Sequence, residues 1–191
     1  MILNILKTLP WYAVGAAIFG VPSILFVIFL FAGPDTESYF SPDFIISTFM
    51  DIDGVIAGGQ DVAEAAEDFF VMFGWLNLNL LIVTIIFSFL WSIGSHFLNI
   101  DGPGKAKFYG ITWLVVTGAC IATLILTNFY ILESTYFRAS QDLSGPNVFQ
   151  MITLTTIYYG FMYYLATILG TARQARSAVL FANKLPARNF L

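Results

Sequence analysis

The chain has 191 residues, of which 58% are hydrophobic and only 10% are charged, and its mean hydropathy is +0.80. Soluble domains carry about a quarter charged residues. The composition therefore excludes an ordinary cytosolic enzyme, a disordered chain and a nucleic-acid-binding protein. It predicts an all-α integral membrane protein, in which lipid surrounds many of the side chains.

Four apolar stretches are long enough to cross a bilayer core of about 30 Å, which takes about 20 helical residues. They cover residues 11–32, 69–94, 108–132 and 148–171, and none of them contains Asp, Glu, Lys or Arg. Because hydrocarbon offers the backbone no hydrogen-bond partners, each stretch is expected to be a helix. The first is longer than a signal-peptide core and is interpreted as a retained helix. The sequence thus predicts a four-transmembrane-helix bundle in a single membrane domain, 1–191.

Lysine and arginine are sorted to one side of this bundle. Seven of the eight basic residues precede the first stretch, separate the second from the third, or follow the fourth, and Arg138 is the exception. The positive-inside rule then places both termini in the cytoplasm, which suits a bacterial-type inner membrane. Eleven of the twelve acids fall on the opposite side, with Asp101 the exception. The expected connections are an acidic external loop over 33–68, an external loop over 133–147, a cytoplasmic turn over 95–107 and a cytoplasmic tail over 172–191.

Two segments outside the spans are predicted to be helices at the membrane surface. Residues 41–43, Ser-Pro-Asp, are typical of a helix start, and apolar residues over 44–56 share one face. Gly58-Gly59 should end this amphipathic outer helix, and residues 60–68 should extend the second span into solvent. The tail is predicted to be a basic juxtamembrane helix in contact with anionic lipid through Arg173, Arg176, Lys184 and Arg188.

Small and polar residues recur at three- and four-residue spacing along the spans, so they share one face of each helix. Helix packing explains these seams better than a polar path does, because ion routes usually contain charged side chains and the spans contain none. The candidate interface or seam residues are Asn77, Asn79, Thr84, Ser88, Thr117, Thr156, Gly160, Tyr163 and Thr167.

Asn77 and Asn79 are expected to be the most polar side chains within the spans, and they point to nearly opposite faces at 100° per residue. Asn77 can form hydrogen bonds inside the bundle. Asn79 then either reaches the outer headgroups from a shallow position or faces another protein chain, since an amide in contact with lipid is costly. The sequence leaves these two possibilities open.

A group of tyrosines lies near the middle of the fourth stretch and allows two interpretations. One is an aromatic site for a quinone, pigment or lipid tail, and the other is core packing with each hydroxyl bonded to a Thr or Asn. Packing is favoured because 17% of the chain is aromatic. His96 is interpreted as an interfacial side chain and Cys120 as a packing residue. The tyrosines are Tyr158, Tyr159, Tyr163 and Tyr164.

The sequence contains no nucleophile–base pair, phosphate-binding loop or metal-ligand cluster, so we expect neither enzymatic activity nor a cofactor. The favoured function is a non-catalytic structural or accessory subunit of a membrane assembly, such as a secretion, conjugation or energy-converting complex. Its partners would be membrane lipids and other membrane protein chains, in a homo- or hetero-oligomer, but not nucleic acid. The alternatives are a homo-oligomeric channel or transporter for cations or small solutes, and a quinone- or pigment-binding redox or photosynthetic subunit.

Overall fold

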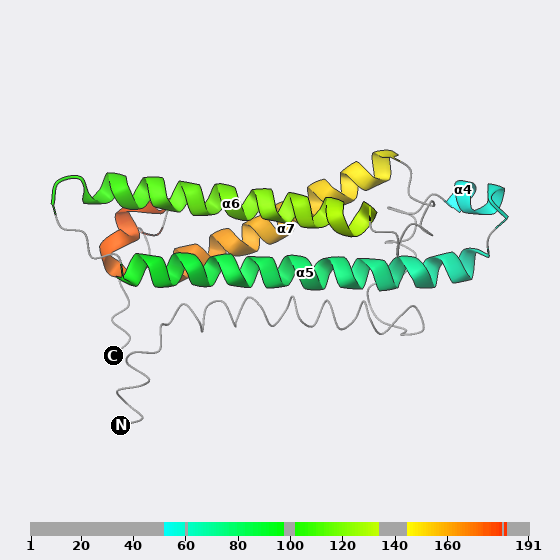
Figure 1. Cartoon of the computed structure of the whole chain (residues 1–191), viewed down its shortest axis with the longest axis horizontal. Helices are drawn as coiled ribbons and strands as arrows, with labels where there is room; N and C mark the ends of the chain where they lie inside the picture. Colours follow the sequence, from blue (N-terminus) through cyan, green and yellow to red (C-terminus); the bar gives the residue numbers. More distant parts are fainter. Residues whose placement is uncertain (1–51, 60, 98–101, 134–144, 181, 183–191) are drawn as a thin grey trace, which may run out of the picture.

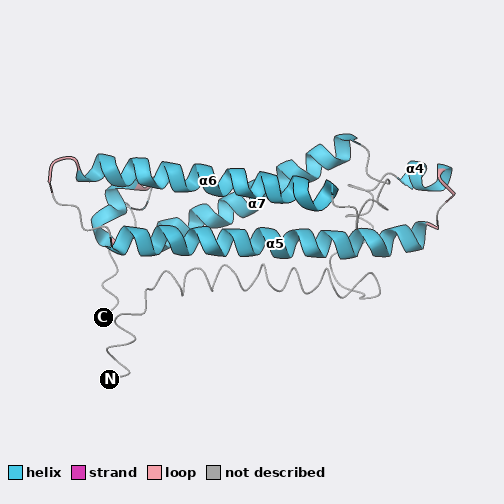
Figure 2. Ribbon diagram, in the orientation of Figure 1, coloured by secondary structure: helices cyan, strands magenta, loops and turns pink. Residues whose placement is uncertain are grey.

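A computed structural model of the chain describes residues 52–59, 61–97, 102–133, 145–180 and 182. Within these residues all regular structure is helical and no strand occurs (Figure 2). The all-α class is thus confirmed for the described part of the chain. The helices are α4 (Ile52–Ala57), α5 (Val62–Phe97), α6 (Lys105–Glu133), α7 (Gly145–Gly170) and the 3-10 helix η1 (Arg173–Ala178). The predicted first span (11–32), the start of the outer helix (41–51), Lys184 and Arg188 lie outside the described residues.

The long helices α5, α6 and α7 each pack against the other two, and α6 runs antiparallel to α5 (Figure 1). They contain the whole of the predicted stretches 69–94 and 108–132 and all but the last residue of 148–171. η1 turns back after α7 and packs on α6 and α5. The backbone therefore reverses direction at the same end of the bundle where α5 ends and α6 begins.

Two of these helices, α5 and α6, are long and apolar enough to cross a membrane. The 36 residues of α5 correspond to about 54 Å of helix, well beyond a bilayer core of about 30 Å. The excess is at the start, where Glu64 and Asp68 are exposed, as the sequence predicts for an extension into solvent. Crossing by four helices remains a prediction.

A glycine turn joins α4 to α5. The Gly58 amide donates to the Gly54 carbonyl at 2.9 Å, and Gly59 has φ of +74°, a conformation that a residue with a Cβ adopts only with strain. The turn lets Val55 pack, fully buried, against Ala65 on α5. Its neighbour Ile56 is 61% exposed, so the apolar face predicted for 44–56 is only partly covered in this last turn.

The elements that carry the described charges lie at the two ends of the bundle, with α4 and the start of α5 at one end and the start of α6 and η1 at the other (Figure 1). Exposed acids lie on α4 and around the start of α5, and Glu133 ends α6 toward the same end. The start of α6 and η1 form the other end and carry the basic residues. The acids on these elements are Asp53, Asp61, Glu64, Glu67, Asp68 and Glu133, and the basic residues are Lys105, Lys107, Arg173 and Arg176, of which Glu67 and Arg173 are described by their backbone alone.

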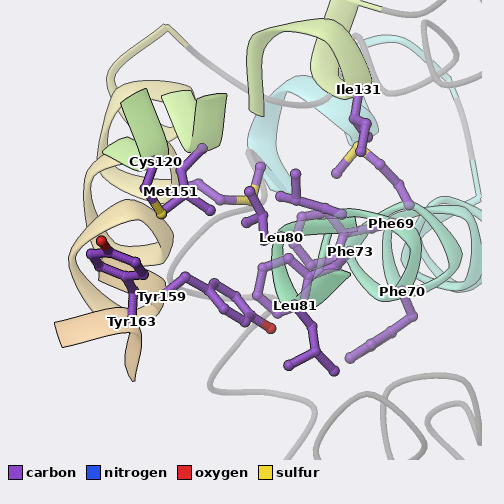
Figure 3. Packing of buried hydrophobic residues seen from close by; sticks show 13 residues of the cluster. Phe69, Phe70, Phe73, Leu80, Leu81, Cys120, Ile131, Met151, Tyr159 and Tyr163 are labelled. Atoms are coloured by element: carbon purple, nitrogen blue, oxygen red, sulfur yellow. The ribbon is translucent and has the colours of Figure 1, made fainter. Parts of the chain in front are cut away.

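Aromatic and aliphatic side chains fill the space between the three long helices. Phe69 and Phe73 stack on α5 with ring centroids 5.8 Å apart. Figure 3 shows them in one cluster with Cys120 of α6 and with Met151 and Tyr159 of α7. A second cluster, at the basic end, is built from large aromatic residues of α5 and α6 and small residues of the tail. Its buried members are Trp91, Tyr109, Trp113, Ala175, Val179 and Ala182.

Candidate functional site

The first polar contact between helices joins α5 to α7. The Tyr159 hydroxyl donates to Asn77 Oδ1 at 3.0 Å, and Asn77 Nδ2 donates to the Phe73 carbonyl at 2.8 Å. Tyr159 is fully buried and Asn77 is 2% exposed. Both ends of the amide are satisfied, as a polar group removed from solvent requires.

A second contact joins α6 to α7 through Asn128, which is fully buried. Asn128 Oδ1 accepts from the Thr155 hydroxyl at 3.0 Å. Asn128 Nδ2 donates to the Leu124 carbonyl at 3.0 Å and to Thr156 Oγ1 at 3.4 Å. One amide thus holds two successive residues of α7. The sequence interpretation overlooked Asn128 when it singled out Asn77 and Asn79 as the most polar side chains of the spans.

Further along the same two helices, the hydroxyls of Thr117 and Tyr163 lie 3.3 Å apart. Tyr163 is 1% exposed, so this contact gives a buried phenol its partner. α7 therefore presents polar groups to both neighbours, toward α5 at Tyr159 and toward α6 at Thr155, Thr156 and Tyr163.

The C-terminal end of α7 is held by side chains of α5. Trp91 Nε1 donates to Thr171 Oγ1 at 2.8 Å, and the backbone amide of Ala172 donates to Ser95 Oγ at 3.2 Å. Gln174 Nε2 donates to the Ser95 carbonyl at 3.0 Å. The last four carbonyls of a helix lack intrahelical partners, and the Ser95 carbonyl is one of these four in α5. The Gln174 bond therefore also caps α5.

Other seam hydroxyls bond within their own helices. Thr84 donates to the Leu80 carbonyl at 2.8 Å, Ser88 to the Thr84 carbonyl at 2.7 Å, and Thr167 to the Tyr164 carbonyl at 2.7 Å. All three residues are buried. They let helices pack without leaving a hydroxyl unpaired, but no interhelical bond of theirs is seen among the described residues.

The structure separates the two asparagines of α5. Asn79 is half-buried on the far side from Asn77, and its Nδ2 donates to the Trp75 carbonyl at 2.9 Å.

Gly160 on α7 is half-buried too, and a Cβ built on it would meet nothing within 4 Å. Its small size is therefore not required by a close helix contact within the described chain.

The central tyrosines differ in burial and in the groups that they contact. Tyr159 and Tyr163 are buried, Tyr158 is 42% exposed, and the Tyr164 hydroxyl donates to the Leu180 carbonyl at 3.0 Å. Tyr158 and Tyr159 meet edge to face with centroids 5.0 Å apart. Their contacts are those of packed side chains that also anchor the tail.

Neither a family model nor a curated protein nor a solved structure matches this chain. Its function must therefore be argued from its own residues. Among the described residues, no three His, Cys, Asp or Glu side chains gather as a metal site requires. Cys120 is fully buried with a free thiol in the core between the helices.

The predicted lipid-contacting residues are only partly described. Arg176 is half-buried on η1, between Ala175 and Val179, which pack in the second cluster. Only the backbone of Arg173 is described, and the same is true of His96 on α5. In the second cluster, against which η1 packs, the structure adds a residue with no sequence signal for a ligand: Trp113 is 6% exposed, and its Nε1 has no hydrogen-bond partner among the described residues.

Proposed function

We propose that the chain is an integral membrane protein with four crossings and serves as a non-catalytic structural or accessory subunit of a larger membrane assembly. The observation that carries this proposal is the use of the buried amides. The polar atoms of Asn77 and Asn128 form hydrogen bonds with α7 and with their own helices. In a membrane such bonds hold helices in register, at about 0.6–2 kcal/mol each.

Membrane insertion is supported by the apolar surface of α6. Only 17% of the membrane-length part of this helix is buried within the chain. Leu114, Val115 and Leu126 are 62%, 65% and 67% exposed. A helix in the core of a soluble protein would be mostly covered. Soluble monomers rarely expose contiguous apolar patches beyond about 300–600 Å². Lipid is the solvent that suits this surface.

Orientation is supported by the charges at the two ends. Lys105 and Lys107 begin α6, beside η1 with Arg176, and the described acids lie at the opposite end. By the positive-inside rule the basic end belongs in the cytoplasm, with both termini on that side. α4 then belongs to an amphipathic outer helix, and η1 to a juxtamembrane segment at the inner leaflet. A bacterial-type inner membrane satisfies this arrangement.

A partner chain is supported by the depth of Asn79. It follows Phe69, the first residue of the predicted span, by about 15 Å of helix rise, which corresponds to the middle of a bilayer core of about 30 Å. Headgroups are then out of reach of its amide. No bond of its Oδ1 is seen among the described residues, so this atom can accept from another helix, and a secretion, conjugation or energy-converting complex would supply one.

The test is purification of the tagged full chain from native membranes in a mild detergent, with chemical crosslinking and mass spectrometry. We expect a complex of defined mass in which α5 is crosslinked near Asn79 to another chain. A monodisperse monomer without interchain crosslinks would overturn the proposal. A crosslink from this site to residues 11–32 of the same chain would assign the face to the first predicted span and remove the support that Asn79 gives.

Reconstitution in liposomes separates this function from the alternative of a homo-oligomeric channel or transporter. A structural subunit gives no ion or solute flux under any imposed gradient. Flux that depends on Thr84 or Ser88, the buried hydroxyls of α5, would favour the channel and displace the structural proposal.

A further inference from the structure

The basic end of the bundle contains a buried donor without an acceptor. Trp113 lies on α6 with 6% of its surface exposed, and its Nε1 has no hydrogen-bond partner among the described residues. Its ring lies 6.3 Å from that of Tyr164, at 55°. The other buried indole at this end, Trp91, donates to Thr171 at 2.8 Å. A buried N–H group in a folded protein is nearly always paired, so Trp113 indicates an acceptor that the described residues do not provide.

A half-buried cation lies on the element packed against Trp113. Arg176 belongs to η1, and its neighbours Ala175 and Val179 are buried in the same cluster as Trp113. The Nε atom of Arg176 is shielded from solvent. A guanidinium has five N–H groups and can donate to phosphate oxygens in a planar, paired geometry, in addition to the contacts that it makes within the chain.

The charge of this end calls for an anion. The elements at this end carry four basic residues, which are Lys105, Lys107, Arg173 and Arg176. Asp101, outside the described part, is the one acid that the sequence adds to this end. The excess of positive charge favours an anionic partner over a zwitterionic one.

Exposed apolar side chains border the same region. Phe97 ends α5 at 82% exposure, Phe108 on α6 is 43% exposed, and Leu180 after η1 is 63% exposed. Trp113 lies about 12 Å of helix rise beyond Lys105, deeper in the bilayer than the basic residues. A glycerophospholipid has ester carbonyls that can accept a hydrogen bond at that depth. Its phosphate lies nearer the surface, and its acyl chains can lie alongside the exposed apolar residues.

We propose that the basic end of the bundle, between α6 and η1, binds one anionic ester-linked glycerophospholipid, with Arg176 at its phosphate and Trp113 Nε1–H at an acyl ester carbonyl. The inference rests on the membrane placement proposed above. The sequence predicts that the basic tail is attracted to the anionic leaflet as a whole. The proposed site differs because it binds one lipid molecule per chain.

Native mass spectrometry of the full chain in mild detergent, titrated with phosphatidylglycerol or phosphatidylcholine, tests the site. We expect one phosphatidylglycerol per chain, bound at least about tenfold more tightly than phosphatidylcholine. Arg176→Gln should weaken binding roughly thirtyfold, because it removes a charge-assisted hydrogen bond as well as a surface charge. The control Lys107→Gln removes only a surface charge and should weaken binding about fivefold at most. Equal losses in the two variants, or no preference for the anionic lipid, would overturn the proposal.

Trp113→Phe supplies a readout that packing alone would not change, because it keeps an aromatic ring and removes the N–H. The wild-type chain should bind ester-linked phosphatidylglycerol about fivefold more tightly than the ether-linked analogue, which lacks the carbonyl. The variant should bind both equally. In NMR spectra of the ¹⁵N-tryptophan-labelled chain, the indole signal of Trp113 is the one that the variant lacks. In the wild type this signal should shift when the ester lipid is added. Equal binding of ester and ether lipids by the wild type contradicts the Trp113 contact.

Failure of this site is distinguishable from failure of the proposed function. A chain that stays in membranes after alkaline carbonate extraction but shows no lipid preference retains its membrane placement and loses only this site. A chain released by carbonate would remove the membrane placement itself and the lipid site with it.

Discussion

Tyr159 on α7 donates its hydroxyl to Asn77 on α5 across 3.0 Å, in the middle of two packed helices. The Asn77 amide also donates to the Phe73 carbonyl, so this side chain is fixed at both ends. A shift of α7 by one residue would break the bond and leave both groups unpaired in the core. The pair therefore sets the register of α7 against α5.

Tyr159→Phe should lower the free energy of unfolding by about 1 kcal/mol, because it removes one interhelical hydrogen bond and leaves Asn77 Oδ1 unpaired. Titration of mixed micelles with sodium dodecyl sulfate, followed by circular dichroism, measures this. Combining it with Asn77→Leu should cost less than the sum of the two single changes, since they remove the same bond. Tyr130→Phe is the control, because Tyr130 is 78% exposed. An equal loss in the control contradicts the assigned role of the bond.

Asn128→Leu should be more damaging, with a loss of about 2 kcal/mol. The change leaves the Thr155 and Thr156 hydroxyls without their α6 partner. Thr123→Val is the matched control on the same helix, since Thr123 is half-buried and donates only to the Ala119 carbonyl at 2.8 Å. Its effect should stay within about 0.5 kcal/mol. If the two variants unfold alike, Asn128 does not organise the contact between α6 and α7.

The helical class and the extent of α5 and α6 follow from composition and hydropathy, because a run without charges has few other stable structures. The buried faces were harder to predict. On α5 the spacing pattern selects residues that are buried, including Thr84 and Ser88. On α7 it selects Thr156, which lies 3.4 Å from Asn128 Nδ2, and misses Thr155, which donates to Asn128 Oδ1 at 3.0 Å.

The reason is that α7 has apolar residues all round and two neighbours at different angles. A periodic pattern identifies one polar stripe, whereas α7 bonds to α5 through Tyr159 and to α6 through Thr155 and Tyr163. The inward turn of η1 was not predictable either. Its alternation of basic and apolar residues suits a lipid surface, yet Ala175 and Val179 are buried against aromatic residues of the bundle.

Gly59→Ala should loosen α4 from α5. At φ of +74° an alanine Cβ is strained by about 1 kcal/mol, although it would meet no other atom within 4 Å. Val55 then leaves its contact with Ala65 more often, and protease cleavage near the turn should speed up about fivefold. Gly104→Ala is the control, because that glycine is equally open and has no positive φ. Equal cleavage rates in the two variants would show that the turn geometry is not limiting.

Topology can be read from single cysteines in a Cys120→Ala background, since Cys120 is the one native cysteine. Glu64→Cys and Lys107→Cys place thiols at exposed positions on opposite ends of the bundle. A membrane-impermeant maleimide should label Glu64→Cys in intact cells and Lys107→Cys only after permeabilisation. Labelling of Lys107→Cys in intact cells, with Glu64→Cys protected, would reverse the proposed orientation. In the wild-type chain Cys120 should resist even a permeant maleimide until the protein is unfolded.

Asn79→Leu should affect assembly without destabilising the bundle. Among the described residues Asn79 bonds to the carbonyl of Trp75 on its own helix and to no other group, so leucine removes a polar group from a half-buried surface and leaves no described partner on another helix unpaired. Unfolding in micelles should therefore occur at the same or a higher detergent fraction than in wild type. Native gel electrophoresis in mild detergent should show the complex shifted toward monomer by about tenfold, if Asn79 Oδ1 accepts a bond from another chain. Ile86→Leu, on the same exposed side of α5, keeps both size and polarity and should leave the complex intact. An unchanged complex in Asn79→Leu would remove Asn79 from the interface, since the substitution takes away the one amide that this face of α5 offers at mid-membrane depth.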